Sequence, residues 1–411
     1  MAKLDINWFL LSVAAGLGCA PAQQEALPAT APTASAPAVA SAAPVAPSSA
    51  SAPSSASAPR PLLRVGISGD YAPFATSTDS AVPAGFDVDL AKEAAQDLGF
   101  DVAWVTFRWP ELAERVQSNA FDVAMSGVTW QPQRDVTGYM TRAVAHGGPC
   151  VLGDAQAHRI GVNHGGILES WARGKFGQRE LVVVDDNQSL PNLLASGTVG
   201  AIVTDSFERR AFQRPGVPSQ CEPALAQKVY WVTPLRSAEL APRLDAWLEA
   251  NASRVQEAQR RWFGESQPLT ANRHLVDLIA RRFAFMPLVA GLKLARKLPI
   301  EDKPRELEVL EATRQSARKR ELPEAATLEL FRLQIELSKA VQRRQTEPST
   351  LDLGKQIRPA LSSLGDRILA ALVEARPSLG TLASADLEAL SPWLSPSERQ
   401  QLLGALQAVA K

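Results

Sequence analysis

The sequence predicts an α/β module followed by an all-helical module, and three observations support this division. From Leu62 to about Gly264, short apolar runs alternate with amphipathic helical stretches. After Gln267 and Pro268 these runs end, and long segments follow whose apolar positions recur at helical spacing. At 411 residues the chain is also too long for one ordinary core, so two globular units are expected.

In the first module, the expected strands lie at residues 63–67, 101–105, 123–125, 181–184 and 201–203, and the clearest helices at 90–98 and 111–116. Strands that alternate with helices in this way favour largely parallel sheets. We therefore expect an α/β domain over residues 62–265.

In the second module, the expected helices cover residues 274–295, 303–320, 324–344 and 356–374. Pro299, Pro304, Pro323 and Pro348 fall at the joints, where a missing backbone donor does least harm. Two shorter amphipathic helices between residues 381 and 411 are expected to pack against this bundle. The helical domain is predicted to span residues 272–411.

The first residues predict export. Lys3 precedes a short apolar stretch, Trp8 to Gly18, that ends in small residues and Cys19, which is the pattern of a signal peptide over residues 1–19. The residues before Cys19 resemble a lipobox without its usual leucine. Two alternatives stay open: Cys19 is lipidated and tethers the protein to a membrane, or cleavage after residue 22 discards it. Both predict a periplasmic or exported protein.

Residues 20–61 consist almost entirely of alanine, proline and serine. They contain no aromatic residue and no periodic apolar face that could bury a core. This composition predicts a disordered tether between the export signal and the α/β module.

Composition excludes several function classes. Lysine plus arginine and aspartate plus glutamate number 43 each, so overall charge predicts no nucleic-acid partner. Four histidines at dispersed positions form no metal-ligand cluster, and neither a phosphate-binding glycine loop nor a nucleophile triad is present. We expect no metal and no cofactor.

Several segments of the first module carry a resemblance to a known family. They are LRVGISGDYAPF at 63–74, GFDVD at 85–89 and FDVAMSGVT at 121–129. Together with Arg134 they resemble the periplasmic solute-binding proteins of the amino-acid type, in which two lobes close over a ligand. The resemblance implies that Arg134 holds the ligand carboxylate while Gly127, Thr129 and Asp205 supply polar contacts. A guanidinium can make paired hydrogen bonds to a carboxylate, which agrees with that role.

Within that superfamily the module is similar to the cyclohexadienyl dehydratases, which remove water and carbon dioxide from prephenate. The matching segments are residues 69–74, 109–110, 124–127, 163–166 with Glu169, 204–205 with Glu208, and Lys228 with Tyr230. Expulsion of the ring hydroxyl requires a proton, because hydroxide is a poor leaving group. The resemblance implies that Glu169 is this general acid and that Lys228 contacts the substrate.

Plainer interpretations of these residues remain open. Glu169 would then be a solvated carboxylate in a first helical turn, Arg134 an exposed surface arginine and Lys228 a strand-edge lysine. Asp205 and Glu208 could cap or flank a helix.

One segment departs from the dehydratase pattern. Residues 145–149 stand where those enzymes carry an arginine and a lysine, and His146 is the candidate substitute. The same comparison places a cysteine near Cys221, and export favours oxidation, so a disulfide between Cys150 and Cys221 is expected.

Polar residues in the helical module fall in phase with one another. Arg282 and Lys293 are 11 positions apart, about three turns, so both are expected on one face of a single helix. Ser338 and Gln342 are i,i+4 neighbours on another helix. Because inward-facing cations and amides are costly without a partner, the pattern predicts a pocket for a dianion. Any single arginine here could equally belong to a solvated face, as we expect for Arg281.

This set resembles the AroQ-type chorismate mutases from about residue 274 to 345. The matching positions are Arg282, Lys293, residues 299–302 with Asp302, Arg305, Ser338 and Gln342. A later helix containing residues 364–368 looks like the secreted subclass, with Arg367 as the candidate that completes the pocket. The resemblance implies that Arg282, Arg305 and Arg367 clamp carboxylates, that Lys293 and Gln342 donate to the ether oxygen, and that Ser338 and Asp302 orient hydroxyl groups.

Together the two resemblances imply a bifunctional enzyme of phenylalanine biosynthesis. Its small-molecule substrates would be chorismate, and prephenate or arogenate. The alternative keeps the mutase and makes the α/β module a non-catalytic receptor for an amino acid or keto acid. A third interpretation, a tethered sensor whose modules are both inert, is disfavoured by the intact spacing of the mutase positions.

Overall fold

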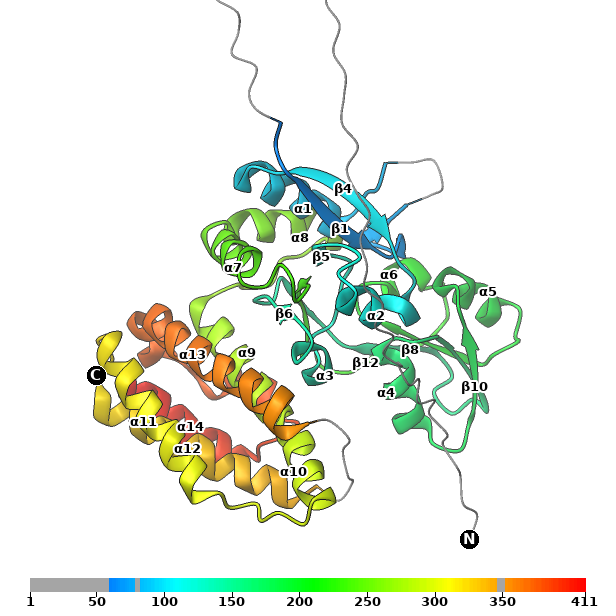
Figure 1. The fold of residues 1–411 in the computed structure, drawn as a ribbon. Coiled ribbons are helices and arrows are strands. Elements are labelled where there is room, and N and C mark those ends of the chain that lie inside the picture. The colour runs from blue at the N-terminus through cyan, green and yellow to red at the C-terminus, as the bar shows by residue number, and fades with distance from the viewer. Residues whose placement is uncertain (1–58, 78–81, 346–351) are drawn as a thin grey trace, which may run out of the picture. The chain divides into compact units, whose positions relative to one another are not determined.

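The computed structural model describes residues 59–77, 82–345 and 352–411 (Figure 1). The expected signal segment 1–19, Cys19 and nearly all of the expected tether 20–61 lie outside the described residues. The elements described below belong to one unit, Ala58–Lys411.

The first lobe of the α/β module is built on a five-stranded sheet of order β4-β1-β5-β14-β6 (Figure 1). Its strands are β1 (Leu62–Ile67), β4 (Asp101–Thr106), β5 (Val123–Ala124), β6 (Tyr139–Met140) and β14 (Trp231–Val232). Strand β1 pairs in parallel with β4 and β5, whereas β14 is antiparallel to β5 and β6. Helix α1 (Phe86–Leu98) packs against α7 (Leu240–Ala250) and α8 (Ala252–Phe263), and its buried face joins the core of this sheet.

The second lobe has a five-stranded sheet of order β10-β9-β11-β8-β12. Its strands are β8 (Pro149–Gly153), β9 (Arg159–Asn163), β10 (Glu180–Val184), β11 (Ala201–Asp205) and β12 (Ser219–Cys221). Helices α4 (Ile167–Phe176) and α5 (Leu190–Ala195) both contact β9 and β11. Cys150 on β8 and Cys221 on β12 are register partners and form a disulfide.

Short elements connect the lobes and border the space between them. Strand β7 (Ala145–Gly147) pairs antiparallel with β13 (Ala226–Lys228), and these two strands lie where the chain passes from one lobe to the other. The remaining short elements are β2 (Asp70–Tyr71), β3 (Ala75–Thr76), α2 (Leu112–Gln117), α3 (Pro132–Asp135) and α6 (Arg209–Phe212). The carboxyl end of β11, at Asp205, and the end of β13, at Lys228, come within hydrogen-bond distance here.

The second module is helical, as predicted. Its helices are α9 (Ala271–Ala284), α10 (Met286–Ala295), α11 (Lys303–Lys319), α12 (Glu324–Arg343), α13 (Arg358–Ala375) and α14 (Pro396–Val409). The single helix expected over residues 274–295 is divided at Phe285, where Pro287 at the start of α10 provides no backbone donor to continue the ladder. Helices α9, α12, α13 and α14 contribute their apolar faces to one shared core.

Arg281 is not on a solvated face, contrary to the sequence prediction. Its side chain on α9 is fully buried. The guanidinium donates to the carbonyl oxygens of Met140 and Thr141, at 3.1 and 2.8 Å, and to Oε1 of Gln227 at 2.7 Å. Those acceptors belong to the α/β module, so this arginine bonds the start of the helical module to the segments around β6 and β13.

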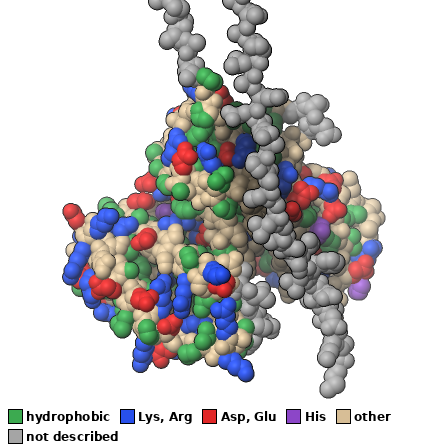
Figure 2. All heavy atoms as spheres, viewed as in Figure 1, with side chains coloured by type: hydrophobic (Ala, Val, Ile, Leu, Met, Phe, Trp, Pro, Cys, Tyr) green, Lys and Arg blue, Asp and Glu red, His purple; other side chains and the backbone are tan. Residues whose placement is uncertain are grey.

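The exposed surface carries both signs of charge. Figure 2 shows lysine and arginine side chains interspersed with aspartate and glutamate side chains over α11 and α12. Several of them pair locally, as Arg318 does with Glu324 at 2.7 Å. None of the helices in the described ranges is both long and apolar enough to cross a lipid bilayer.

Candidate active sites

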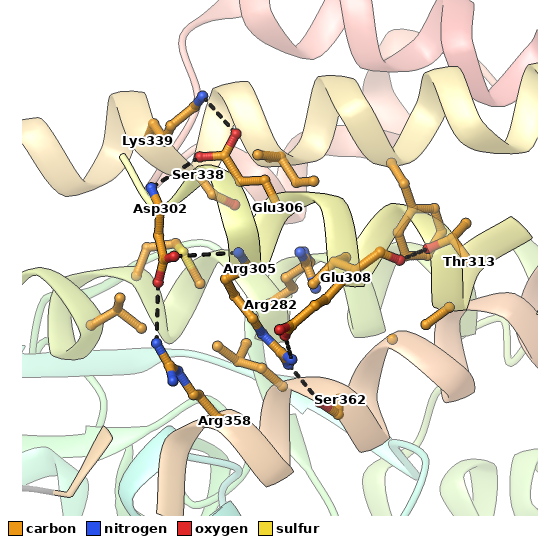
Figure 3. A pocket seen from close by; sticks show the side chains of 18 of the residues that line it. Arg282, Asp302, Arg305, Glu306, Glu308, Thr313, Ser338, Lys339, Arg358 and Ser362 are labelled. Carbon is orange, nitrogen blue, oxygen red and sulfur yellow. Dashed lines mark hydrogen bonds and ion pairs between the residues drawn. The ribbon is translucent and has the colours of Figure 1, made fainter. Parts of the chain in front are cut away.

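The helical module encloses a cavity of about 250 Å³, bounded by α9, α10, α11, α12 and α13 (Figure 3). Six residues expected from the sequence line it: Arg282, Lys293, Asp302, Arg305, Ser338 and Gln342. Five of them lie on four helices and Asp302 is the N-cap of α11, and the division of α9 from α10 does not separate Arg282 from Lys293. The spacing in the sequence therefore brings all six to one place.

Arg282 is a buried cation of this cavity, with 8% of its surface exposed. Its Nε has no hydrogen-bond partner among the described residues, and its guanidinium lies 6.0 Å from the centre of the Phe331 ring. Burial, with a smaller contribution from the neighbouring charge of Arg305, lowers the pKa of Arg282 to about 10. A buried guanidinium with an open donor is a site for an anion.

Lys293 and Gln342 reach the same cavity from different helices. The Nζ of Lys293 donates to the carbonyl oxygen of Ile300 at 2.5 Å, and burial lowers its pKa against the opposing charges of Asp302 and Glu306. The Oε1 of Gln342 has no partner within the described part of the chain, and one turn earlier the same holds for Oγ of Ser338. Several polar groups of this cavity are thus available to a ligand.

Asp302 organises the entrance to α11. Its Oδ1 accepts from the backbone N–H of Arg305 at 3.3 Å, which caps the helix, and its Oδ2 accepts from Arg358 at 3.1 Å (Figure 3). The Arg305 side chain extends to Glu308 at 2.9 Å and to Ser362 at 3.0 Å. Asp302 therefore orients cationic neighbours as well as facing the cavity.

Arg367 does not complete this cavity, which corrects the sequence prediction. It lies on α13 against the α/β module, 4.5 Å from the centre of the Tyr139 ring and 3.9 Å from Asp245. Each helical residue turns about 100°, so position 367 points almost opposite to position 358, nine residues earlier. Arg358 is the arginine of α13 that lines the cavity.

A second cavity, of about 50 Å³, lies between the lobes of the α/β module. Five residues expected from the sequence line it: Gly127, Thr129, Arg134, Asp205 and Lys228. Further lining residues include Tyr71, Trp109, Asn163, Asn187 and Glu208. Both lobes thus contribute polar groups to one pocket.

Arg134 is not an exposed surface arginine. Burial lowers its pKa to about 10, its Nη1 donates to the carbonyl oxygen of Thr129 at 3.0 Å, and its guanidinium lies 5.7 Å from the centre of the Trp231 ring. Within the described ranges it forms no ion pair with a carboxylate. Its charge is therefore available to a ligand carboxylate.

Lys228 joins the two lobes through hydrogen bonds. Its Nζ lies 3.0 Å from Oδ2 of Asp205, 2.7 Å from the hydroxyl of Tyr71 and 3.2 Å from Oγ1 of Thr129. The Tyr71 hydroxyl donates in turn to Asp205. At 5% exposure Lys228 is not a solvated strand-edge lysine. Asp205 also accepts from the backbone N–H groups of Phe207 and Glu208, so it caps a turn as well as facing the pocket.

Gly127 meets a steric requirement of this pocket. Its φ is 62°, and a Cβ there would lie 2.4 Å from the Tyr71 ring. Its N–H donates to Oδ2 of Asp87 at 2.5 Å, which holds the turn in place. Any larger residue would push Tyr71 away from Asp205 and Lys228.

Glu169, expected as the general acid, does not line the pocket. Its carboxylate accepts from the backbone N–H of Gly165 at 2.9 Å and from Arg173 at 2.6 Å. Although desolvation opposes them, these bonds and the charge of Arg173 together lower the pKa of Glu169. Arg173, one turn later on α4, binds the Glu169 carboxylate in place of a substrate. A carboxyl with a lowered pKa is also a poor proton donor.

Glu208 occupies the contrasting position. It lines the pocket, is 1% exposed, and accepts hydrogen bonds from the Thr204 hydroxyl at 2.9 Å and from the Asn187 amide. Burial first, and then the charge of Asp205, raise the pKa of Glu208 well above its ordinary value.

His146 does not replace the missing cation of residues 145–149. It is 4% exposed, and its Nε2 lies 2.8 Å from Oδ2 of Asp277 on α9. Its neighbours Gly147, Gly148 and Pro149 line the pocket in its place. The imidazole therefore serves the contact between modules.

Comparison with known families matches both modules. Residues 63–265 match the model of the bacterial extracellular solute-binding proteins, family 3, and residues 270–343 match chorismate mutase type II. The chain carries a family 3 solute-binding domain followed by a type II chorismate mutase domain. The predicted fold class, two-lobed α/β followed by AroQ-type helical, is confirmed.

Relatives of the solute-binding domain include an enzyme and binding proteins. Cyclohexadienyl dehydratase of Pseudomonas aeruginosa is 30% identical over 167 residues, which cover 37% of this chain and 62% of that protein. The L-cystine-binding protein TcyJ of Escherichia coli is 25% identical over 158 residues, 36% of this chain and 59% of that protein. The chain thus spans less than two thirds of the length of these curated relatives.

Solved structures similar to the solute-binding domain include AncCDT-1, an ancestral amino-acid-binding protein and precursor of cyclohexadienyl dehydratase. It has a TM-score of 0.45 and 23% identity, and the match covers 49% of this chain and 95% of that one.

Sequence reasoning missed several residues that line the mutase cavity. Arg358, Glu306 and Lys339 all line it, and Lys339 pairs with Glu306 at 3.2 Å (Figure 3). The signal for Arg358 was the recurrence of Leu361, Gly365 and Leu369 at helical spacing, which defines the inward face of α13.

Proposed function

We propose that this chain is a bifunctional enzyme of phenylalanine biosynthesis. Its mutase domain rearranges chorismate to prephenate, and its solute-binding domain converts prephenate, or arogenate, by loss of water and carbon dioxide. The observation that carries the first activity is the cavity in which Arg282, Ser338 and Gln342 keep polar atoms that have no partner among the described residues. The second activity is supported by the dehydratase relative and by a pocket with an open arginine.

The mutase reaction requires positioning rather than a nucleophile. Chorismate rearranges within one molecule, so the enzyme accelerates it by holding a compact dianionic conformer and stabilising charge on the breaking ether oxygen. Arg282 and Arg305 bind the carboxylates, with Arg358 at the cavity edge. Lys293 and Gln342 donate to the ether oxygen.

The dehydratase reaction consumes the product of the mutase. Arg134 binds the side-chain carboxylate of prephenate, and Lys228 and Thr129 contact its polar groups from the opposite wall. A buried acid protonates the ring hydroxyl, and decarboxylation then restores the aromatic ring.

A receptor is the second candidate for the solute-binding domain. The lowered pKa of Glu169 and its bond to Arg173 favour this alternative, because they remove the acid that the sequence assigned. In a receptor, Arg134 would bind the carboxylate of an amino acid or keto acid and Asp205 an amino group. The relatives that are named for binding cystine or arginine are consistent with this role.

We also propose that the protein acts after export, in keeping with the extracellular family of its first domain. Lipidation of Cys19 would then hold it at a membrane surface.

The purified full chain, supplied with chorismate at neutral pH, tests the proposed function. We expect chorismate to disappear and phenylpyruvate to form, followed together by chromatography. Neutral pH matters because acid converts prephenate without an enzyme. Accumulation of prephenate without phenylpyruvate would leave a mutase fused to a receptor, and unchanged chorismate would refute the mutase itself.

A further inference from the structure

Lys339 is a buried cation of the mutase cavity, and it lies on α12 directly after Ser338. Only 7% of its surface is exposed. Its Nζ lies 3.2 Å from Oε2 of Glu306 and 2.7 Å from Oε1 of Glu336. A buried ammonium is costly unless it is paired with a carboxylate, so these contacts hold the lysine in place. Glu336 is largely exposed, whereas Glu306 lines the cavity, so Lys339 acts on the site through Glu306.

The Glu306 carboxylate retains capacity to accept hydrogen bonds. Its Oε1 accepts from the backbone N–H of Asp302 at 3.4 Å, and its Oε2 accepts from Lys339 (Figure 3). Because a carboxylate offers about four acceptor positions, each oxygen can take a further donor. The Asp302 carboxylate, in contrast, uses one oxygen to cap α11 and the other to bind Arg358. Glu306 is therefore well placed to accept a hydrogen bond from a ligand in this cavity.

Chorismate requires such an acceptor. Its ring hydroxyl is a donor, whereas its two carboxylates and its ether oxygen accept hydrogen bonds. The cavity is lined by Arg282, Lys293 and Arg305, which offer donors and no acceptor. The substrate hydroxyl is therefore matched by the Glu306 carboxylate rather than by these cations.

The charges of Lys339 and Glu306 both act on Lys293, the proposed donor to the ether oxygen. Burial is the main cause that lowers the pKa of Lys293, the charge of Glu306 opposes this decrease, and the charge of Lys339 adds to it. A carboxylate near a substrate dianion would by itself repel the substrate, and a paired cation offsets this repulsion. The pair thus gives the cavity an acceptor whose negative charge is neutralised.

We propose that Lys339 is a positioning residue of the chorismate rearrangement, an inference that rests on the proposed mutase activity. Its ammonium holds Glu306 in the orientation in which this carboxylate accepts a hydrogen bond from the ring hydroxyl. The hydroxyl and the ether oxygen stand on adjacent ring carbons, so this contact fixes the ring with its ether oxygen toward Lys293 and Gln342. Orientation of this kind accelerates an intramolecular reaction, because less freedom of motion is lost on the way to the transition state.

Lys339→Met in the full chain tests the proposal with two substrates, chorismate and an analogue whose ring hydroxyl is replaced by hydrogen. We expect kcat/KM for chorismate to fall about tenfold, since a hydrogen bond to a charged group contributes roughly that factor or more. For the analogue, kcat/KM should stay within about threefold of the wild-type value, whereas a merely structural role would lower both. Lys339→Arg keeps the charge and should restore chorismate conversion to within about threefold of wild type. Glu336→Gln removes the exposed partner of the lysine and is the matched control, which should leave both values unchanged.

Each other outcome decides against a distinct statement. A loss of similar size with both substrates would mean that Lys339 only supports α12, and no loss with either would mean that Glu306 needs no partner; both results overturn the proposal. A Lys339→Arg variant as impaired as Lys339→Met overturns the ion pair as the cause. A wild type that leaves chorismate unchanged refutes the mutase activity itself. Circular dichroism reports folding of the variants, and should Lys339→Met fail to fold, Lys339→Gln decides by the same comparison of the two substrates.

Discussion

The two pockets differ in what their polar side chains already contact. In the mutase cavity of about 250 Å³, atoms of Arg282, Ser338 and Gln342 have no partner in the part of the chain that the structure describes. In the solute-binding pocket of about 50 Å³, Lys228 and Asp205 bond to each other and to Tyr71 across the lobes. The first site is organised for an anion, whereas in the second Lys228 and Asp205 pair with each other and Arg134 remains available to a ligand.

This difference agrees with the two chemistries. An unpaired buried donor costs roughly 1 to 3 kcal/mol of free energy. A hydrogen bond to a substrate dianion recovers this free energy, and the gain is largest where negative charge develops in the transition state. The second pocket instead contains a carboxyl, Glu208, whose pKa is raised well above its ordinary value, mainly by burial. Disrupting either arrangement should therefore affect different kinetic constants.

Lys293→Ala should give the largest effect on the mutase side. Removing a donor directed at developing oxyanion charge costs about 2.7 to 4 kcal/mol in other enzymes, so we expect a loss of roughly 10² to 10³-fold in kcat for chorismate. The conversion of chorismate to prephenate, measured by absorbance, checks this.

Lys319→Ala is the matched control, because that lysine is exposed near the end of α11. It should retain wild-type kcat. Equal activity of Lys293→Ala and wild type would show that Lys293 does not act on the ether oxygen.

Arg358→Ala should give an intermediate effect. A hydrogen bond to a charged group contributes about 1.5 to 3 kcal/mol, and the 44% exposure of this side chain places the expected loss near the lower limit, about tenfold in kcat/KM. Arg367→Ala is the comparison, because that side chain faces Tyr139 and Asp245, and it should leave the KM for chorismate unchanged. The reverse ranking would restore Arg367 as the arginine that completes the cavity.

The mutase cavity was predictable because the spacing of residues along a helix determines which of their side chains point in the same direction. Positions 282 and 293 share a face, as do 338 and 342, and the break at Phe285 is too slight to undo this. Resemblance to a subclass points to Arg367, whereas the face of α13 that contains Leu361 and Gly365 contains Arg358.

The solute-binding pocket was harder to predict because its residues come from loops and strand ends far apart in the sequence. Tyr71, Asp205 and Lys228 meet only after the lobes are assembled, and no spacing relates them. The pKa of a carboxyl depends on burial and neighbours rather than on residue type, so the sequence could not show that Arg173 binds Glu169 while Glu208 is buried.

Asp87→Asn should give the smallest effect, which is a change in how the stability of the solute-binding domain depends on pH. Asp87 lies on α1, is 1% exposed, and burial raises its pKa from 3.8 to about 7 against the hydrogen bond from Gly127. Between about pH 4 and 7 the folded state keeps a proton that the unfolded chain has released, so stability falls as pH rises. Asp87→Asn should remove about 1 to 2 kcal/mol of this decline between pH 5 and 7, since one pKa unit corresponds to roughly 1.4 kcal/mol.

Urea denaturation at pH 5, 6 and 7, followed by tryptophan fluorescence, measures the stability of the solute-binding domain, which contains Asp87. Trp393 is the only tryptophan of the mutase domain within the described residues, so the signal reports mainly on the solute-binding domain. Asp101→Asn, at the exposed start of β4, is the control and should keep the wild-type pH dependence. Identical pH dependence in wild type and Asp87→Asn would mean that this carboxyl is already ionised in the fold.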